Sequence, residues 1–115
     1  MRPRGVHHVA IDVRDLDAAE AFYGGVLGLP LLARHATPDG APRSVWLDMG
    51  DGAILMLERG AGGHGKYVLA LRIAREERAA WSAKLAVQAS TAYTLYVLDP
   101  DGNKVGLSHY PEPAI

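Results

Sequence analysis

The sequence of 115 residues contains no cysteine, which excludes a disulfide framework, a thiolate zinc site and a cysteine nucleophile. Aromatic residues make up only 7% of the chain, and no apolar run is long enough to span a bilayer. The 12 Lys and Arg residues nearly balance the 13 Asp and Glu residues, so the net charge is −1. Such a balance provides no basic stripe for nucleic acid and no charge excess for a membrane surface. We therefore expect neither nucleic acid nor membrane as a partner.

The remaining composition is that of an ordinary globular protein, with 49% apolar and 22% charged residues. A chain of this length forms one domain with a real core, here residues 1–115. The segment Met1–Gly5 lacks the apolar stretch of a signal peptide. We therefore expect a cytoplasmic location.

The two halves of the chain repeat each other. His8–Val13 is similar to Val68–Ile73, and Asp51–Leu57 is similar to Asp101–Leu107. Self-similarity within a short chain indicates two copies of one supersecondary unit. Each half is predicted to run strand, helix, strand, strand, strand. The predicted boundaries are module one at 6–58, a glycine-rich linker at 59–66 and module two at 67–110.

Local patterns define the elements of the first half. Alternation of apolar and polar residues over 6–13 predicts a half-buried strand. Asp15 or Asp17 is expected to cap a helix, with Glu20 completing a capping box with Asp17 and Gly28 ending the helix. Further strands are predicted at 30–36, 43–49 and 53–58, with turns at Pro38–Gly40 and Asp51–Gly52.

The second half follows the same plan with one shortened element. Its predicted elements are strands at 67–73, 93–98 and 103–109, a helix at about 76–87 and a turn at Pro100–Gly102. Trp81 and Leu85 are expected to form the apolar pair that Phe22 and Val26 form in the first helix. The strand after the second helix is at most a stub near residues 86–90.

Four segments in this order carry a resemblance to a known family: His7–Val13, Asp15–Tyr23, Val26–Leu29 and Asp99–Asn103. Together they resemble the glyoxalase/bleomycin-resistance/extradiol-dioxygenase superfamily, also called the vicinal oxygen chelate superfamily. The resemblance implies an α+β fold of two βαββ modules that form a curved mixed sheet around a cavity, here with a shortened second module. It also implies a homodimer.

The same resemblance identifies four positions where metal-dependent members place ligands. They fall on His8, Met56, Val68 and Gly106. Valine and glycine side chains bind no metal, and a thioether is a poor ligand for Fe, Mn, Ni or Mg. Since a catalytic metal needs two or three protein ligands, we expect no metal and no cofactor.

A rebuilt metal site is the alternative. It would combine His8 and Glu58 with one of the other histidines, which are His7, His35, His64 and His109. His7 is expected to point to the opposite sheet face from His8, because neighbouring strand residues alternate.

Strand alternation and the family register together predict a small-molecule pocket. Its ligand-binding residues are predicted to be His8, Trp46, Met56, Val68, Arg72, Thr94, Tyr96 and Gly106. Flat ligands stack well on Trp46 and Tyr96, and Arg72 would orient an anionic or carbonyl group. Gly106, in place of a glutamate, is expected to leave room at the centre. The plain alternative is that the two aromatic residues only fill core volume.

The sequence therefore predicts a metal-independent protein that binds a small organic molecule, with drug or metabolite sequestration as the nearest analogy. One alternative is a glyoxalase-like lyase, dioxygenase or isomerase with a non-standard or absent metal site. In that case His8 is the candidate acid or base, since imidazole titrates near neutral pH. His8 is otherwise a vestigial ligand or a hydrogen-bonded core residue. A non-catalytic structural or regulatory subunit is the third hypothesis.

Overall fold

The computed structural model describes residues 1–62 and 68–115. Contacts divide the chain into two compact units, Met1–Gly63 (unit 1) and His64–Ile115 (unit 2). Unit 1 contains β1 (His8–Val13), α1 (Leu16–Glu20), the π-helix η1 (Ala21–Val26), β2 (Leu31–Ala36), β3 (Pro42–Gly50) and β4 (Ala53–Arg59). Unit 2 contains β5 (Leu69–Arg72), the 3₁₀ helix η2 (Arg75–Glu77), α2 (Arg78–Lys84), β6 (Ala89–Ser90), β7 (Thr94–Leu98) and β8 (Lys104–Ser108).

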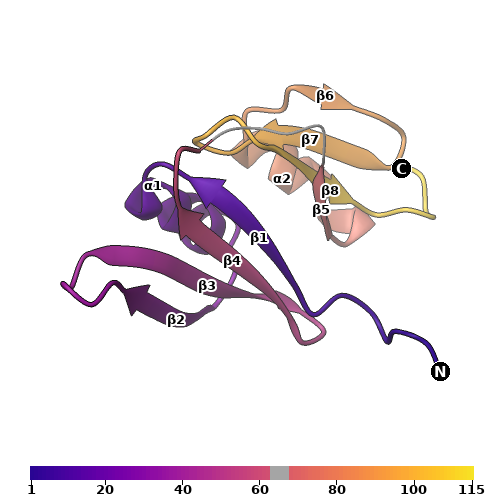
Figure 1. Ribbon diagram of the computed structural model, residues 1–115. Coiled ribbons are helices and arrows are strands. Elements are labelled where there is room, and N and C mark those ends of the chain that lie inside the picture. Colours follow the sequence, from indigo (N-terminus) through magenta and orange to yellow (C-terminus); the bar gives the residue numbers. More distant parts are fainter. Residues whose placement is uncertain (63–67) are drawn as a thin grey trace. The chain divides into compact units, whose positions relative to one another are not determined.

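Each unit forms one four-stranded mixed sheet, and the strands can be followed in Figure 1. Sheet A, in unit 1, has the order β1-β4-β3-β2, and sheet B, in unit 2, has the equivalent order β5-β8-β7-β6. In both sheets the first strand pairs in parallel with the last one. The predicted repeat is thereby confirmed, and β6 is the stub expected near 86–90.

The first helix begins at a local cap. The carboxylate of Asp15 accepts a hydrogen bond from the backbone N–H of Ala18 at 3.0 Å, so Asp15 and not Asp17 is the N-cap. The predicted capping box is wrong, because Glu20 binds Arg34 on β2 instead. Gly28 ends the helical segment as predicted, with a φ of +79° that favours glycine.

The core of unit 1 lies between this helical segment and one face of sheet A. The buried helical residues are Leu16, Ala19, Tyr23 and Leu27, and the strands contribute Ile11, Val13, Val45, Leu47, Leu55 and Leu57. The predicted pair Phe22 and Val26 is only half-buried, whereas the neighbouring Tyr23 is completely buried. Every second strand residue therefore points away from the helix.

Unit 2 has a weaker helical layer. No residue of α2 is buried, and Trp81 and Leu85 are half-buried. The helix ends at Lys84, earlier than the predicted Val87, because Leu85 is extended with φ −114° and ψ 154°. The buried residues of sheet B are Leu69, Leu95, Val97, Val105 and Leu107.

Two turns close the repeated hairpins. Asp51 and Gly52 both have positive φ, 53° and 82°, which is the geometry of a type I′ turn. At the second turn the buried carboxylate of Asp99 accepts from the backbone N–H of Asp101 (2.9 Å) and of Asn103 (2.7 Å). It also accepts from Nδ2 of Asn103 at 2.8 Å. These bonds fix the connection between β7 and β8.

Among the described residues, no helix combines the length and apolar character needed to cross a bilayer.

Candidate functional site

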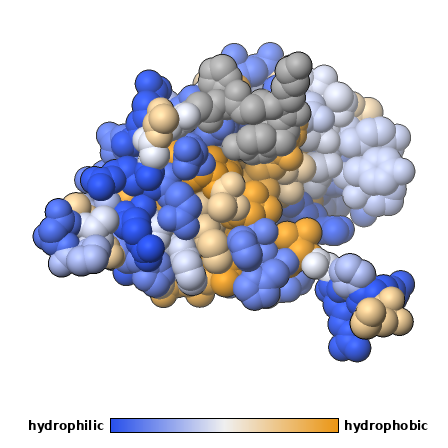
Figure 2. Space-filling view, in the orientation of Figure 1, coloured by the Kyte–Doolittle hydropathy of each residue, from blue (hydrophilic) through white to orange (hydrophobic). Residues whose placement is uncertain are grey.

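Sheet A has one face covered by helix and one face that we call its open face. The strand residues on the open face are His8, Ala10, Asp12, Ala33, His35, Ser44, Trp46, Asp48, Ile54, Met56 and Glu58. Met56 lies between Ala10 on β1 and Trp46 on β3 in the register. Trp46 therefore faces away from the helix, as the alternation predicted. Figure 2 shows hydrophobic residues over the middle of unit 1 with hydrophilic residues around them.

His8 lies exposed at the start of β1, and it is in contact with His7. The two Nδ1 atoms are 2.9 Å apart, so one imidazole donates to the other. The two side chains do not point apart as predicted, because their rings are in edge-to-face contact with centroids 5.2 Å apart. The pair presents two exposed imidazoles at one edge of sheet A.

Three residues of the open face form what we call the polar cluster: His35, Ser44 and Trp46. His35 is opposite Ser44 in the register, and the rings of His35 and Trp46 are 4.4 Å apart at 62°. Three side-chain atoms, Nε2 of His35, Oγ of Ser44 and Nε1 of Trp46, are buried without a hydrogen-bond partner in the described structure. Buried polar atoms are rarely left unpaired, so this cluster calls for a physical explanation.

Two residues of the polar cluster, His35 and Ser44, line a small cavity of about 240 Å³ near the β2–β3 connection. Residues of α1 and of the helix-covered face of sheet A complete its lining, among them Leu16, Glu20 and Val45. Register shifts in the β2–β3 pairing lie between Leu31 and Ala33 and between His35 and Ala36. Sequence reasoning missed the role of His35, because strand alternation cannot be counted through such bulges.

The open face of sheet A is acidic. It carries Asp12, Asp48 and Glu58, and none of its strand residues is Lys or Arg. Asp12 lies directly opposite Glu58, an arrangement that is unfavourable between like charges. A Cβ added at Gly60 would lie 2.7 Å from both carboxylate oxygens of Asp12, so only glycine fits beside this carboxylate.

The open face of sheet B has the opposite charge. Its strand residues are Ala70, Arg72, Ala89, Thr94, Tyr96, Leu98, Lys104, Gly106 and Ser108. It therefore carries Arg72 and Lys104 and no carboxylate. Nζ of Lys104 lies 5.6 Å from the centre of the Tyr96 ring. Oγ1 of Thr94 donates to Oγ of Ser108 at 2.9 Å, so this pair is already satisfied.

Gly106 offers less room than predicted. It is opposite Tyr96 on β7 and Ala70 on β5. A Cβ built at Gly106 would lie 3.2 Å from Cγ2 of Thr94, and 3.4 Å from both Cβ of Ala70 and Cε1 of Tyr96. The ring of Tyr96 thus occupies part of the expected space.

The four positions that the resemblance assigns to metal ligands offer few donors for a divalent metal. Only His8 supplies a suitable donor, and Met56, Val68 and Gly106 do not. Val68 lies just before β5 and is 45% exposed. Within residues 1–62 and 68–115, no group of three or more His, Asp or Glu side chains lies close enough to hold a metal ion. His64, one histidine of the alternative site, falls outside the described residues.

His109 has a structural environment. Its Nε2 lies 2.9 Å from Nη1 of Arg78, and its Nδ1 lies 2.6 Å from the carbonyl oxygen of Glu112. Arginine can only donate, so Nε2 accepts and Nδ1 carries the proton. The buried ring therefore joins α2 to the C-terminal segment. Arg72 and His109 both line a cavity of about 260 Å³ in unit 2.

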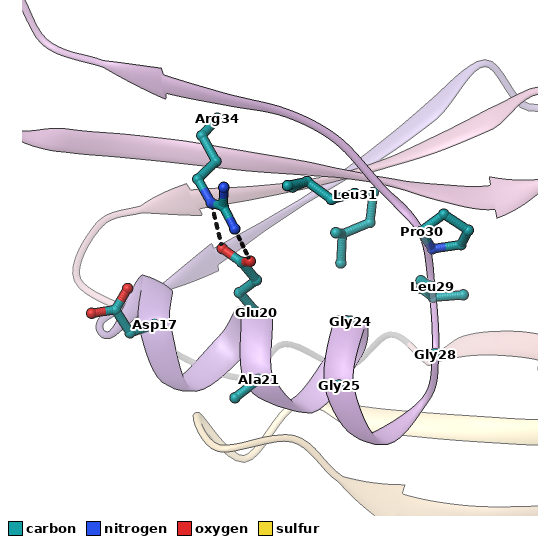
Figure 3. Close-up of a pocket in the computed structure, with 11 residues that line it drawn as sticks. Asp17, Glu20, Ala21, Gly24, Gly25, Gly28, Leu29, Pro30, Leu31 and Arg34 are labelled. Carbon is teal, nitrogen blue, oxygen red and sulfur yellow. Dashed lines mark hydrogen bonds and ion pairs between the residues drawn. The ribbon is translucent and has the colours of Figure 1, made fainter.

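A further groove of unit 1 lies on the helical side, where sequence reasoning placed no site. It measures about 620 Å³, runs between α1–η1 and β2, and is lined in part by Gly24, Gly25 and Gly28. Figure 3 shows Glu20 and Arg34 paired across it, with Nε–Oε1 at 3.0 Å and Nη2–Oε2 at 2.5 Å. The hydrogen bonds from Arg34 lower the pKa of Glu20, and the same bonds raise the pKa of Arg34. In the sequence, the closely spaced glycines of this helical segment were the pattern that could have indicated the groove.

Comparison with known proteins identifies the family. The sequence model of the Glyoxalase/Bleomycin resistance protein/Dioxygenase superfamily matches residues 5–107. A search of curated proteins found no match.

Solved structures of several relatives are similar to this chain. A glyoxalase/dioxygenase from Nostoc punctiforme is 25% identical, with a TM-score of 0.76 over 95% of this chain and 92% of that one. TnmS3, an antibiotic binding protein from Streptomyces sp. CB03234, is 25% identical, with a TM-score of 0.71 over 99% of both chains. Lactoylglutathione lyase from Agrobacterium tumefaciens is 23% identical, with a TM-score of 0.75 over 95% and 96%.

Proposed function

The chain belongs to the Glyoxalase/Bleomycin resistance protein/Dioxygenase superfamily, and we propose that it is a metal-independent member that binds a small organic molecule. The observation that carries the proposal is the donor set at the family's ligand positions. His8 offers an imidazole and Met56 a thioether, whereas Val68 offers only a hydrocarbon side chain and Gly106 has no side chain. This set leaves a metal without enough protein ligands.

The open faces of the two sheets carry the apolar, aromatic and polar side chains that are typical of small-molecule sites. The predicted ligand-binding residues in the strands, which are His8, Trp46, Met56, Arg72, Thr94, Tyr96 and Gly106, all lie on these faces. Apolar and aromatic side chains with a few polar groups are the usual lining of ligand sites. Trp46 and Tyr96 offer rings for stacking, and Arg72 offers a cation for an anionic or carbonyl group. Val68 completes the proposed set.

The similarity to TnmS3 supports sequestration as the role. That protein is described as antibiotic binding and aligns with the chain over its full length. We propose the same class of activity here, namely binding of a drug or metabolite without turnover, in a cytoplasmic homodimer.

Metal content tests the proposal directly. Protein purified without chelator is expected to hold far less than one equivalent of Ni, Mn, Fe, Co or Zn by elemental analysis. Its ligand binding is expected to be unchanged after dialysis against EDTA. Near-stoichiometric metal that is removed together with activity would refute metal independence.

A catalytic role for His8 is the second candidate, as a lyase, dioxygenase or isomerase with an absent or non-standard metal site. The contact between the exposed imidazoles of His7 and His8 favours it, because one ring can hold the proton that the other exchanges. The variant His8→Gln separates the two functions. Under the binding proposal the substitution changes only ligand affinity and there is no turnover to lose, whereas under the catalytic one it abolishes turnover while the ligand still binds.

A further inference from the structure

The polar cluster of unit 1 has hydrogen-bonding capacity that the described structure leaves unused. Nε1 of Trp46, Oγ of Ser44 and Nε2 of His35 are buried without partners, and Ser44 is only 2% exposed. Leaving buried polar atoms unpaired costs free energy, so they are usually paired with protein, water or a ligand. All three residues lie on the open face of sheet A, beside Met56 and Glu58.

We propose that the polar cluster binds an uncharged oxygen acceptor, such as a carbonyl group, on a flat aromatic ligand. The inference rests on the proposed function and adds the chemical class of its ligand. The indole N–H of Trp46 can only donate, and the hydroxyl of Ser44 can donate as well. One carbonyl oxygen, with two lone pairs, satisfies both donors, and the ligand's ring system stacks on the indole.

The His35 imidazole controls access to this subsite. Its ring lies 4.4 Å from that of Trp46, and it borders the cavity of about 240 Å³ that Ser44 also lines. A ligand that stacks on the indole requires the imidazole to turn away from Trp46. Turning exposes one face of the indole and the two donor groups. His35 is therefore a positioning residue, whose movement accompanies ligand entry.

The charge of the open face selects among ligands. Asp12, Asp48 and Glu58 lie on this face, and no strand residue there is Lys or Arg. An anionic group placed on this open face meets three carboxylates, and that repulsion strengthens where water is excluded. The subsite therefore takes an uncharged or cationic part of an aromatic ligand and disfavours an anionic group at this position.

Three matched probes test the inference on the intact chain. They are 9-fluorenone, fluorene, which lacks the carbonyl oxygen, and 9-fluorenone-4-carboxylate, which adds a negative charge. Dissociation constants are measured by calorimetry. Emission of Trp46 is followed in parallel in a Trp81→Phe background, where it is the remaining tryptophan. Fluorenone is expected to bind about thirtyfold more tightly than fluorene, the factor that two net hydrogen bonds supply. The carboxylate is expected to bind more weakly than fluorenone.

Substitutions test whether the preference for fluorenone comes from the indole N–H of Trp46 and the hydroxyl of Ser44. Trp46→Phe keeps a ring but removes the indole N–H, so the preference for fluorenone over fluorene is expected to fall, and Ser44→Ala is expected to act in the same direction. Ser82→Ala, at an exposed position on α2, is the matched control and leaves the preference unchanged. Glu58→Gln is expected to raise the affinity for the carboxylate probe severalfold.

The outcomes separate this inference from the proposed function. Equal affinity of the intact chain for fluorenone and fluorene overturns the carbonyl subsite while leaving aromatic ligand binding in place. A preference that survives both Trp46→Phe and Ser44→Ala places the carbonyl elsewhere. If none of the three probes binds, the aromatic ligand class of the proposed function fails together with the subsite. The comparison of probes on the wild-type chain does not depend on any variant folding.

Discussion

Gly106 and Tyr96 face each other on neighbouring strands of sheet B, and the tyrosine ring lies beside the position that a side chain would occupy. A glycine inside a strand lacks a side chain to pack and weakens the strand. An aromatic ring across from it offsets this weakness by covering the exposed backbone. The ring of Tyr96 therefore fills part of the space that a side chain at position 106 would occupy.

Substitution of Gly106 by alanine is expected to destabilise the protein by about 1–3 kcal/mol, the range typical of overpacking. The added Cβ would meet Thr94, Ala70 and Tyr96 at 3.2–3.4 Å, and these strand residues have little freedom to move. Urea unfolding of the wild type and of Gly106→Ala measures the difference in their free energies of unfolding.

Gly25→Ala is the control for this prediction. A Cβ at Gly25 meets nothing within 4 Å, and the residue lies in a helical segment where alanine is favoured over glycine. The free energy of unfolding of Gly25→Ala is expected to equal or exceed that of the wild type. A neutral effect of Gly106→Ala would mean that the Tyr96 ring moves aside freely.

At the scale of elements, the ion pair between Glu20 and Arg34 connects the helical segment to the edge strand β2. Because β2 is the edge strand of sheet A and pairs with β3 there, this side-chain connection supports its outer edge. The two residues are separated by 14 positions in the sequence. Such a partner leaves no local pattern, which explains why the sequence suggested a capping box for Glu20 instead.

The contribution of this ion pair is expected to depend on pH. Arg34 holds the pKa of Glu20 below its ordinary value of 4.5, so the folded state favours the ionised carboxylate. The stabilisation is fully present above pH 4.5 and is lost as the pH falls through the lowered pKa. Arg34→Ala is therefore expected to be less stable than the wild type at pH 7, with the difference shrinking below pH 4.5.

Urea titrations at a series of pH values measure this difference. Arg43→Ala, an exposed arginine on the neighbouring strand β3, is the control for general loss of positive charge. A difference between Arg34→Ala and wild type that stays constant from pH 7 down to pH 2 would show that Glu20 does not carry the effect.

The strands could be predicted from the sequence, whereas the buried helical face could not. Alternation in β1, β3 and β4 is local, and together with the family register it put Trp46 and Met56 on one face, in agreement with their pairing in the sheet. On the helix, Phe22 with Val26 and Tyr23 with Leu27 have the same helical spacing. Which pair is buried depends on packing against sheet A, and the structure selects the second pair.

At the scale of the whole molecule, exposed strand edges favour association. Leu31 and Leu32 at the edge strand β2 are 43% and 52% exposed, and the edge strand β6 has only two residues. Proteins cover such edges to avoid uncontrolled pairing. We therefore expect a homodimer, with twice the mass of one chain by light scattering at micromolar concentration. A monomeric mass under those conditions would contradict the proposal.

The family and the fold of two similar modules could be predicted, because the repeat and the turns are local patterns formed by residues that are neighbours in the sequence. The polar cluster could not, because it depends on bulges that shift β2 against β3. The alternation gave Ser44 and Trp46 the same face, but nothing local indicated that His35 would cover the indole. The space at Gly106 was overestimated for a related reason, since it depends on the rotamer of Tyr96 across the sheet.

The chain contains two tryptophans, and each unit holds one of them: Trp46 on β3 and Trp81 on α2. Their surroundings differ, since His35 contacts the ring of Trp46 and Nζ of Lys84 lies 5.2 Å from the centre of the Trp81 ring. The protein thus has a native optical reporter in each half of its repeat. Single-tryptophan variants therefore make the cooperativity between the two halves measurable without any label, as the coincidence or separation of two melting curves.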